Sequence, residues 1–181
     1  MGCKVNRAIF LDRDGIINED GNYVYEPKNF RFVEGIFDFC RAAQDKGYLL
    51  IVVTNQSGIA RGYYTEDDFL RLNDWMRAKF QEQGILISRV YYCPFHPEKG
   101  IGQYKTDSYD RKPNPGMLFK AKDEFDLDLL NSIVIGDRDS DMEAGRKAGT
   151  GKLLLLPGKY EYTAADDVNI ISALSDAERF L

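Results

Sequence analysis

Five short apolar runs, separated by segments with helical spacing, constrain the fold of this chain more than any other feature of its sequence. The runs are AIFL (8–11), YLLIVVT (48–54), RVYY (89–92), SIVIG (132–136) and KLLLL (152–156). They are continuous rather than alternating, which is typical of strands covered on both faces. Strand and helix in repeated alternation predict an α/β fold, a doubly wound parallel sheet with helices on both faces.

Apolar stripes predict the first two helices. Stripes over 36–43 and 69–80 have helical spacing, and these helices are expected to end near Gly47 and Gly84. The final stretch, 172–181, is expected to form a closing helix.

Capping signals predict two further helices. One is expected to begin at Asn114 and Pro115, since Asn can cap a helix and Pro suits its first turn. The other is expected to begin at Ser140, paired with Glu143 in a capping box, and to end near Gly149.

Length and composition exclude several classes of protein. With 181 residues, the chain is expected to form one domain, 1–181, without a separate cap domain, and to be a monomer. A formal net charge of -5 argues against a nucleic acid or an anionic membrane as partner. Three widely separated cysteines and the absence of an apolar signal segment indicate a cytoplasmic protein without a disulfide framework. No apolar run approaches the roughly 18 residues that span a bilayer.

Acidic residues follow two of the predicted strands. Asp12 and Asp14 come after the first run, and Asp137 comes after the fourth. Ligands of open parallel sheets bind beyond the carboxyl ends of the strands, so we expect these carboxyls to meet at one edge. They would repel one another without a hard cation, and a site with few oxygen ligands favours Mg²⁺. A simple turn is the alternative explanation for the first pair taken alone.

A phosphoryl group is the natural second ligand of such a site, because Mg²⁺ shares its coordination shell with phosphoryl oxygens. A carboxylate can attack phosphorus and form an aspartyl-phosphate. Thr54, at the end of the second run, can supply a hydroxyl, and Lys112 an ammonium, to the equatorial oxygens. For Lys112 alone, a solvated surface cation is the alternative.

Four ordered motifs, FLDRDG, VVTNQSG, RKPNPG and IGDRDSD, resemble those of the haloacid dehalogenase superfamily of phosphatases. Longer stretches, LDRDGIIN, VTNQSGIARGYYTEDDF, YYCPFHP and RKPNPGML, resemble one branch of it, the heptose bisphosphate phosphatases, which are close kin of the histidinol-phosphate phosphatases. The resemblance extends from about Ala8 to Leu156. It implies an Mg²⁺-dependent phosphatase for a small phosphorylated sugar.

The resemblance implies the C7 phosphate of D-glycero-D-manno-heptose 1,7-bisphosphate as the leading substrate and histidinol phosphate as the nearest alternative. A signalling receiver module, which also gathers acids, a Thr and a Lys around Mg²⁺, is the alternative from another class. In such a module position 54 would be the phosphorylated Asp, whereas here it is Thr54.

The resemblance also implies the roles of the site residues. Asp12 would be the nucleophile, and Asp14 the acid that protonates the departing oxygen and then activates water. Mg²⁺ would be held by Asp12, the backbone carbonyl of Asp14 and Asp137. Thr54 and Lys112 would hold the phosphoryl oxygens.

The resemblance implies substrate-binding residues on three other stretches, and Arg61, on a loop of small residues, could either reach a distal phosphate or be a solvated cation. The substrate-binding candidates are Asp20, Gly21, Asn22, Tyr23, Asn55, Gln56, Ser57, Arg61 and Arg111. A second phosphate on the substrate would favour cations such as Arg61, Arg111 and Arg138, whereas an amine would favour Glu19 and Asp20. Asp141 matches the second acid of the fourth motif, but it also suits the first turn of a helix, and both readings stay open.

The branch usually carries a zinc loop after the third strand. Here Cys93 is kept, but the expected histidine is displaced to His96, and Ser108 and Asp110 replace two cysteines. Because a tetrahedral site needs four ligands, we expect no structural zinc. The loop 93–112 is also expected to set substrate specificity. The aromatic residues that could order it by packing are Phe95, Tyr104 and Tyr109.

Overall fold

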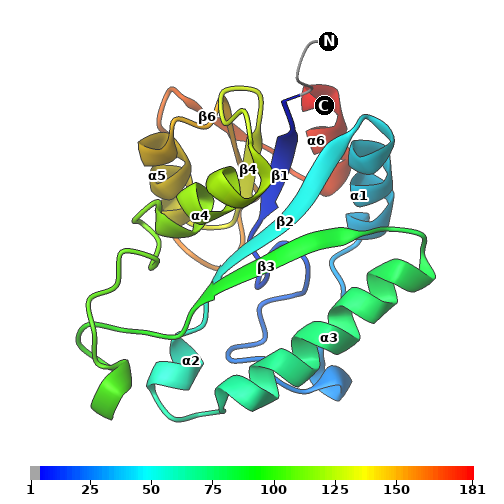
Figure 1. The fold of residues 1–181 in the computed structure, drawn as a ribbon. Coiled ribbons are helices and arrows are strands. Elements are labelled where there is room, and N and C mark those ends of the chain that lie inside the picture. The colour runs from blue at the N-terminus through cyan, green and yellow to red at the C-terminus, as the bar shows by residue number, and fades with distance from the viewer. Residues whose placement is uncertain (1–4) are drawn as a thin grey trace.

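The molecule is built on one open sheet of six parallel strands in the order β3-β2-β1-β4-β5-β6 (Figure 1). The computed structural model describes residues 5–181. The strands are β1 (Arg7–Leu11), β2 (Tyr48–Asn55), β3 (Ile87–Cys93), β4 (Ile133–Gly136), β5 (Lys152–Leu155) and β6 (Val168–Ile170). This arrangement confirms the predicted fold class and adds one strand, β6, that the apolar runs did not reveal.

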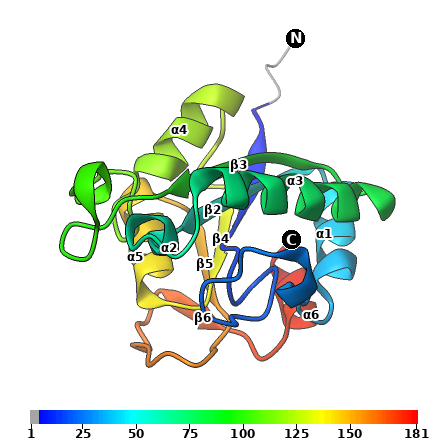
Figure 2. The same ribbon diagram turned by 90° about the horizontal axis from the view of Figure 1, so that it is seen from below.

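Helices cover both faces of the sheet (Figure 2). The face with α1 (Ile36–Asp45), α3 (Glu66–Glu82) and α6 (Leu174–Ala177) lies opposite the face with α4 (Gly116–Phe125) and α5 (Asp139–Ala148). A single turn, α2 (Ser57–Ala60), follows β2, and short 3-10 turns lie at Pro27–Asn29, Gly102–Tyr104 and Glu178–Phe180.

Strand β1 shows why its apolar run is continuous. Ile9 and Leu11 pack into the core beneath α1 and α3, while Ala8 and Phe10 pack into the core beneath α4 and α5. All four side chains are fully buried, as expected of a strand covered on both faces.

Strand β3 departs from that expectation because it lies at an edge of the sheet. Only its two end residues, Ile87 and Cys93, are buried, and Arg89 is exposed. The guanidinium of Arg89 lies 3.7 Å from the carboxylate of Glu124 in α4. A charged side chain on an edge strand discourages pairing with another chain.

Helix α4 begins one residue later than predicted. Pro115 occupies the capping position and Gly116 is the first helical residue, with no side-chain cap. The side-chain amide of Asn114 instead donates to the carbonyl of Ser108, at 3.3 Å. Asn114 therefore ties the helix start to the preceding loop rather than capping the helix.

Helix α5 begins at Asp139, and its capping interaction differs from the predicted pair of Ser140 and Glu143. The carboxylate of Asp141 accepts a hydrogen bond from the amide of Arg138, at 3.1 Å. Glu143 is instead engaged by basic side chains of the same helix. The helix ends as predicted, at Gly149.

None of the helices described within residues 5–181 is both long and apolar enough to span a membrane. Cys40 and Cys93 are buried as free thiols, and Cys3 lies outside the described residues.

Candidate active site

The carboxyl ends of β1 and β4 place two acids at the point where the strand order reverses. β2 and β3 extend the sheet on one side of this pair, and β5 and β6 extend it on the other. Such a reversal is where open parallel sheets bind ligands. Asp12 directly follows β1 and Asp137 directly follows β4, and the amide of Asp12 donates to the carbonyl of Ile135, at 3.0 Å.

Close approach of the chain at this point requires Gly15. Its φ is +93°, and a Cβ there would lie 2.4 Å from a carboxylate oxygen of Asp137. The glycine of the first motif therefore lets the turn after β1 pass against the acid after β4.

Asp12, Asp137 and Asp141 form a buried group of carboxylates. One oxygen from each lies within 4.8 Å of the others, and within residues 5–181 they are the only such group of three or more acid, His or Cys side chains. Oδ1 of Asp137 is buried without a hydrogen-bond partner. Nε of Arg138 lies 3.8 Å from this oxygen, beyond hydrogen-bond distance. An unsatisfied carboxyl oxygen among other carboxyls fits a small, hard divalent cation such as Mg²⁺.

Burial and mutual repulsion keep two of these acids protonated at unusually high pH. Burial, aided by the charges of Asp141 and Asp14 and opposed by Lys112, raises the pKa of Asp12 to about 7. Burial and the charges of Asp12 and Asp141 raise the pKa of Asp137 to about 8. A divalent cation would relieve this repulsion.

Lys112 is buried beside the acids and is not a solvated surface cation. Its Nζ lies 3.0 Å from Oδ1 of Asp12 and 2.5 Å from Oδ1 of Asp141, and it donates to the carbonyl of Val53, at 2.8 Å. Although burial opposes its charge, the two carboxylates raise the pKa of Lys112 to about 12. Asn55 fixes its backbone through hydrogen bonds to the amide and the carbonyl of Lys112, at 3.0 and 2.9 Å.

Asp14 is not part of this group of three and has its own set of donors. Its carboxylate accepts hydrogen bonds from Arg13, at 2.9 Å, from Asn18, at 3.0 Å, and from Gln56, at 3.2 Å. Arg13 and Asn18 are buried, and sequence reasoning singled out neither of them. The only signal was that both belong to the stretch LDRDGIIN.

Gln56 lies beneath the site rather than in its lining. Its amide nitrogen donates to Oγ1 of Thr54, at 2.8 Å, and its carbonyl oxygen accepts from the hydroxyl of Tyr64, at 2.5 Å. Thr54 is fully buried and stands at the end of β2. Gln56 therefore links Thr54 to the carboxylate of Asp14.

Two adjoining hollows open onto these groups. The inner hollow, of about 290 Å³, is lined by Asp12, Lys112 and Asp141 among others, and the outer one has about 320 Å³. Residues that line both are Asp14, Asn55, Ser57, Arg111 and Arg138. The outer hollow adds Asp20, Asn22, Tyr23 and Arg61. Four of the predicted site residues line neither hollow: Gly21, Thr54, Gln56 and Asp137.

Comparison with known proteins places the chain in a family. A family model described as "HAD-hyrolase-like" matches residues 109–176. The chain is 58% identical to the D-glycero-alpha-D-manno-heptose-1,7-bisphosphate 7-phosphatase of Burkholderia mallei, over 83% of this chain and 80% of the relative. The chain belongs to the heptose-bisphosphate phosphatase branch of the haloacid dehalogenase superfamily. This confirms the resemblance seen in its four motifs.

Other proteins of the superfamily resemble the chain in sequence and in structure. The D-glycero-beta-D-manno-heptose-1,7-bisphosphate 7-phosphatase of Vibrio cholerae is 49% identical, over 84% of this chain and 82% of the relative. A solved HAD-like phosphatase from Mesorhizobium loti has a TM-score of 0.87 at 34% identity, covering 99% of this chain and 90% of that one. A D,D-heptose 1,7-bisphosphate phosphatase from B. bronchiseptica, solved with magnesium and phosphate, shares the fold, with a TM-score of 0.81 at 24% identity over 96% of each chain.

Three arginines give the outer hollow a positive lining. Arg61, Arg111 and Arg138 all line it. Burial and the charges of Arg138 and Arg61 lower the pKa of Arg111, so the cations repel one another across the hollow. Nε of Arg61 is buried without a partner. An anionic ligand would satisfy these groups.

The loop 93–112 is ordered by contacts with α3 and within itself. The carboxylate of Glu66 accepts hydrogen bonds from the hydroxyls of Tyr92, at 2.6 Å, and Tyr104, at 2.8 Å. The rings of Phe95 and Tyr104 pack with centroids 6.0 Å apart. Tyr109, which we expected to pack as well, is 62% exposed. The loop that lacks the expected zinc ligands is therefore held by hydrogen bonds to Glu66 and by packing of aromatic rings.

Proposed function

We propose that this chain is an Mg²⁺-dependent phosphatase that removes the C7 phosphate of D-glycero-D-manno-heptose 1,7-bisphosphate. The observation that carries the proposal is the convergence of Asp12, Asp137 and Asp141 with Lys112 at the reversal of strand order. Relatives named for this activity, at 49% and 58% identity over more than four-fifths of the chain, support the substrate.

The Mg²⁺ would be held by the carboxylates of Asp12 and Asp137 and by the backbone carbonyl of Asp14. The carboxylate of Asp141 lies close enough to assist. The ion would supply positive charge that neutralises the carboxylates and polarises the phosphoryl oxygens. Lys112 and Thr54 would hold the equatorial oxygens through their ammonium and hydroxyl groups. The high pKa of Lys112 keeps it charged for this role.

The reaction has two steps at phosphorus. A carboxylate oxygen of Asp12 attacks the C7 phosphate, the bond from phosphorus to the sugar oxygen breaks, and Asp14 gives a proton to that oxygen. Asp14 then takes a proton from a water molecule, which attacks the aspartyl-phosphate, releases inorganic phosphate and restores Asp12. The donors from Arg13, Asn18 and Gln56 orient the carboxylate of Asp14 in both steps.

The charges of the outer hollow favour a second phosphate over an amine. Arg61, Arg111 and Arg138 would meet the distal phosphate of a bisphosphate. Of the two acids that an amine would favour, Glu19 lines neither hollow and Asp20 is already engaged. Although burial acts the other way, hydrogen bonds from Tyr160 and from the Asn22 amide lower the pKa of Asp20. Histidinol phosphate is therefore the weaker candidate.

The remaining expectations stay predictions. They are a single domain over 1–181, a monomer, a cytoplasmic location, no nucleic-acid or membrane partner, and no structural zinc at Cys93. Activity that persists undiminished with a zinc chelator, in excess Mg²⁺, would agree with the last of these.

The test compares hydrolysis of heptose 1,7-bisphosphate, histidinol phosphate and a generic aryl phosphate by the purified chain with Mg²⁺. We expect the bisphosphate to be hydrolysed far faster than the other two, with phosphate released in every turnover. Asp12→Asn should abolish turnover, and Asp74→Asn, which changes an exposed acid of α3, should leave it unaltered. Undiminished activity of Asp12→Asn would refute the mechanism. Preference for histidinol phosphate would refute the substrate, and a stable phosphoprotein without phosphate release would favour a receiver module.

A further inference from the structure

The segment between β5 and β6, residues 156–167, crosses over to the loop that follows β1. The hydroxyl of Tyr160 donates to the carboxylate of Asp20, at 2.9 Å. Nζ of Lys159 donates to Oδ1 of Asn22, at 2.5 Å, and lies 3.2 Å from the carboxylate of Asp20. These contacts join parts of the chain that lie about 140 residues apart in sequence.

The same tyrosine holds an arginine of the outer hollow. The guanidinium carbon of Arg138 lies 3.6 Å from the ring centroid of Tyr160, a close cation–π contact. Nη2 of Arg138 also lies 3.4 Å from Oδ2 of Asp20. Arg138 is therefore fixed by a ring on its face and a carboxylate at its end, although its side chain is 44% exposed. A long side chain held in this way needs less ordering when a ligand binds.

The loop that Lys159 and Tyr160 hold is strained. Asn22 has a φ of 60° and Tyr23 a φ of 56°, both in the left-handed region. Asn tolerates this conformation, but for a bulky residue such as Tyr it is a true outlier that persists only when its surroundings enforce it. Besides the contacts of Lys159 with Asn22, the ring of Tyr23 packs edge-on against Tyr63, at 4.7 Å.

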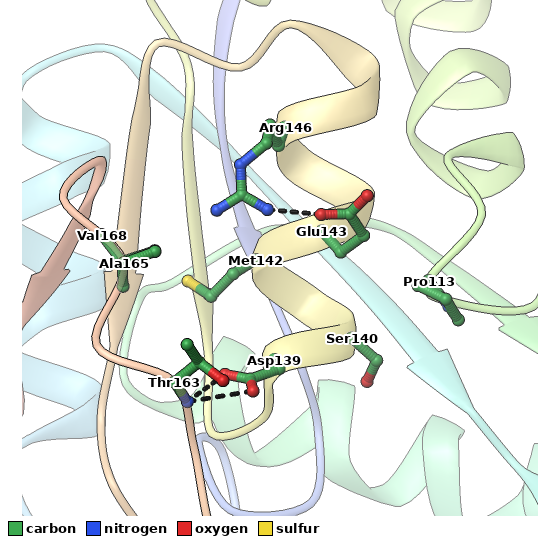
Figure 3. Close-up of a pocket in the computed structure, with 9 residues that line it drawn as sticks. All are labelled: Pro113, Asp139, Ser140, Met142, Glu143, Arg146, Thr163, Ala165 and Val168. Carbon is green, nitrogen blue, oxygen red and sulfur yellow. Dashed lines mark hydrogen bonds and ion pairs between the residues drawn. The ribbon is translucent and has the colours of Figure 1, made fainter.

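The segment 156–167 is itself bound to α5. Figure 3 shows the amide of Thr163 donating to the carboxylate of Asp139, with both oxygens at 3.0 Å. Further along, Asp167 pairs with the guanidinium of Arg146, at 2.6 and 2.8 Å. The segment 156–167 is thus bound to the loop at 20–23 through Lys159 and Tyr160, and to α5 through Thr163 and Asp167. It can therefore transmit the rigidity of α5 to that loop.

We propose that Tyr160 is a positioning residue that fixes Arg138 and Asp20 in the wall of the outer hollow and so sets the affinity for the non-reacting end of the substrate. Tyr160 lines the outer hollow but not the inner one, which holds Asp12 and Lys112. Arg138 also lines the inner hollow, and its Nε lies 3.8 Å from Oδ1 of Asp137, but Tyr160 itself lies outside that hollow. We therefore expect loss of Tyr160 to weaken binding of the distal phosphate and to leave Asp12 and Lys112 in place. This inference rests on the proposed function for its substrate.

The experiment compares three variants by their KM and kcat. Tyr160→Leu removes both the ring contact and the hydroxyl, and Tyr160→Phe keeps the ring against Arg138. Tyr162→Leu is the matched control, because Tyr162 lies in the same segment and is 39% exposed. For heptose 1,7-bisphosphate we expect Tyr160→Leu to raise KM about 10-fold with kcat within twofold, as for loss of uniform binding. Tyr160→Phe should raise KM about threefold, between the control and Tyr160→Leu.

Two further readouts separate this proposal from other failures. Hydrolysis of an aryl phosphate, which has no distal phosphate, should change less than twofold in Tyr160→Leu. Hydrogen exchange of the amides at 20–24 should speed up at least fivefold in Tyr160→Leu and not in Tyr162→Leu. If the wild-type chain hydrolyses the aryl phosphate but not the bisphosphate, the proposed substrate fails and the exchange result alone decides the positioning role. Unchanged exchange at 20–24, or an equal loss of activity on both substrates, overturns the proposal.

Discussion

Replacing Asp137 with Asn should stabilise the metal-free protein at high pH and abolish its stabilisation by Mg²⁺. The pKa of Asp137 rises from 3.8 to about 8 on folding, chiefly through burial and then through the charges of Asp12 and Asp141. The folded chain thus binds more protons than the unfolded chain between these values. Because of that difference, the stability of the metal-free wild type falls as pH rises from about 4 to about 8.

The size of the effect follows from the same shift. At roughly 1.4 kcal/mol per pKa unit, ionised Asp137 carries a penalty on the order of 6 kcal/mol above pH 8. An Asn at this position must still be desolvated and find hydrogen-bond partners, so we expect about 2 kcal/mol to be recovered. For a chain of this length that corresponds to a rise in Tm of about 4 to 8 °C. Between pH 8.5 and pH 5 the wild type regains about 4 kcal/mol as the folded state takes up its proton, so the difference should reverse and the wild type should be the more stable by about 2 kcal/mol at pH 5.

Differential scanning calorimetry at pH 8.5 and pH 5.0, with EDTA and then with excess Mg²⁺, measures these effects. Asp74→Asn is the control, since it removes the same charge from an exposed position in α3 and should leave Tm nearly unaltered. Mg²⁺ should raise the Tm of the wild type and of the control but not that of Asp137→Asn. A lower Tm for Asp137→Asn than for the wild type in EDTA at pH 8.5, or an equal response to Mg²⁺, would refute the reasoning.

Three other predictions follow from the site. Mg²⁺ affinity should rise with pH between about 6 and 8, because the ion must displace protons from Asp12 and Asp137. Calorimetry in buffers of different ionisation enthalpy should detect the released protons, and binding that does not depend on pH would contradict this prediction. Asn18→Ala removes a donor to Asp14 and should lower kcat about 10-fold with little change in KM, so a KM effect alone would count against that role. Glu66→Gln weakens the contacts that order the loop 93–112 and should speed its proteolysis about fivefold, whereas a zinc chelator should not.

The sheet and the main acids could be predicted because their signals are local. Each central strand is a continuous apolar run, and Asp12 and Asp137 directly follow two of them. Strand β6 escaped prediction because it has only three residues, two of them exposed, and pairs only with β5. Its place in the sheet depends on tertiary pairing rather than on an apolar pattern.

The orientation of side chains at the site could not be predicted from the sequence, because it too depends on tertiary contacts. The pattern of Ser140 and Glu143 suggested a capping box, but Asp141 takes that place because its carboxylate can reach the Arg138 amide and Lys112 at once. The contact between Tyr160 and Asp20 has no local pattern, because it joins segments that only the completed sheet brings together.

The decisive experiment is a crystal structure grown with Mn²⁺, which replaces Mg²⁺ and is identified by its anomalous scattering, and with trifluoroberyllate as a phosphoryl mimic. We predict one ion bound at about 2.0 to 2.3 Å by carboxylate oxygens of Asp12 and Asp137. Beryllium should be bonded to Asp12, with its fluorines in contact with Lys112 and Thr54. An ion bound elsewhere, or beryllium bonded to Asp14, would contradict the proposed arrangement.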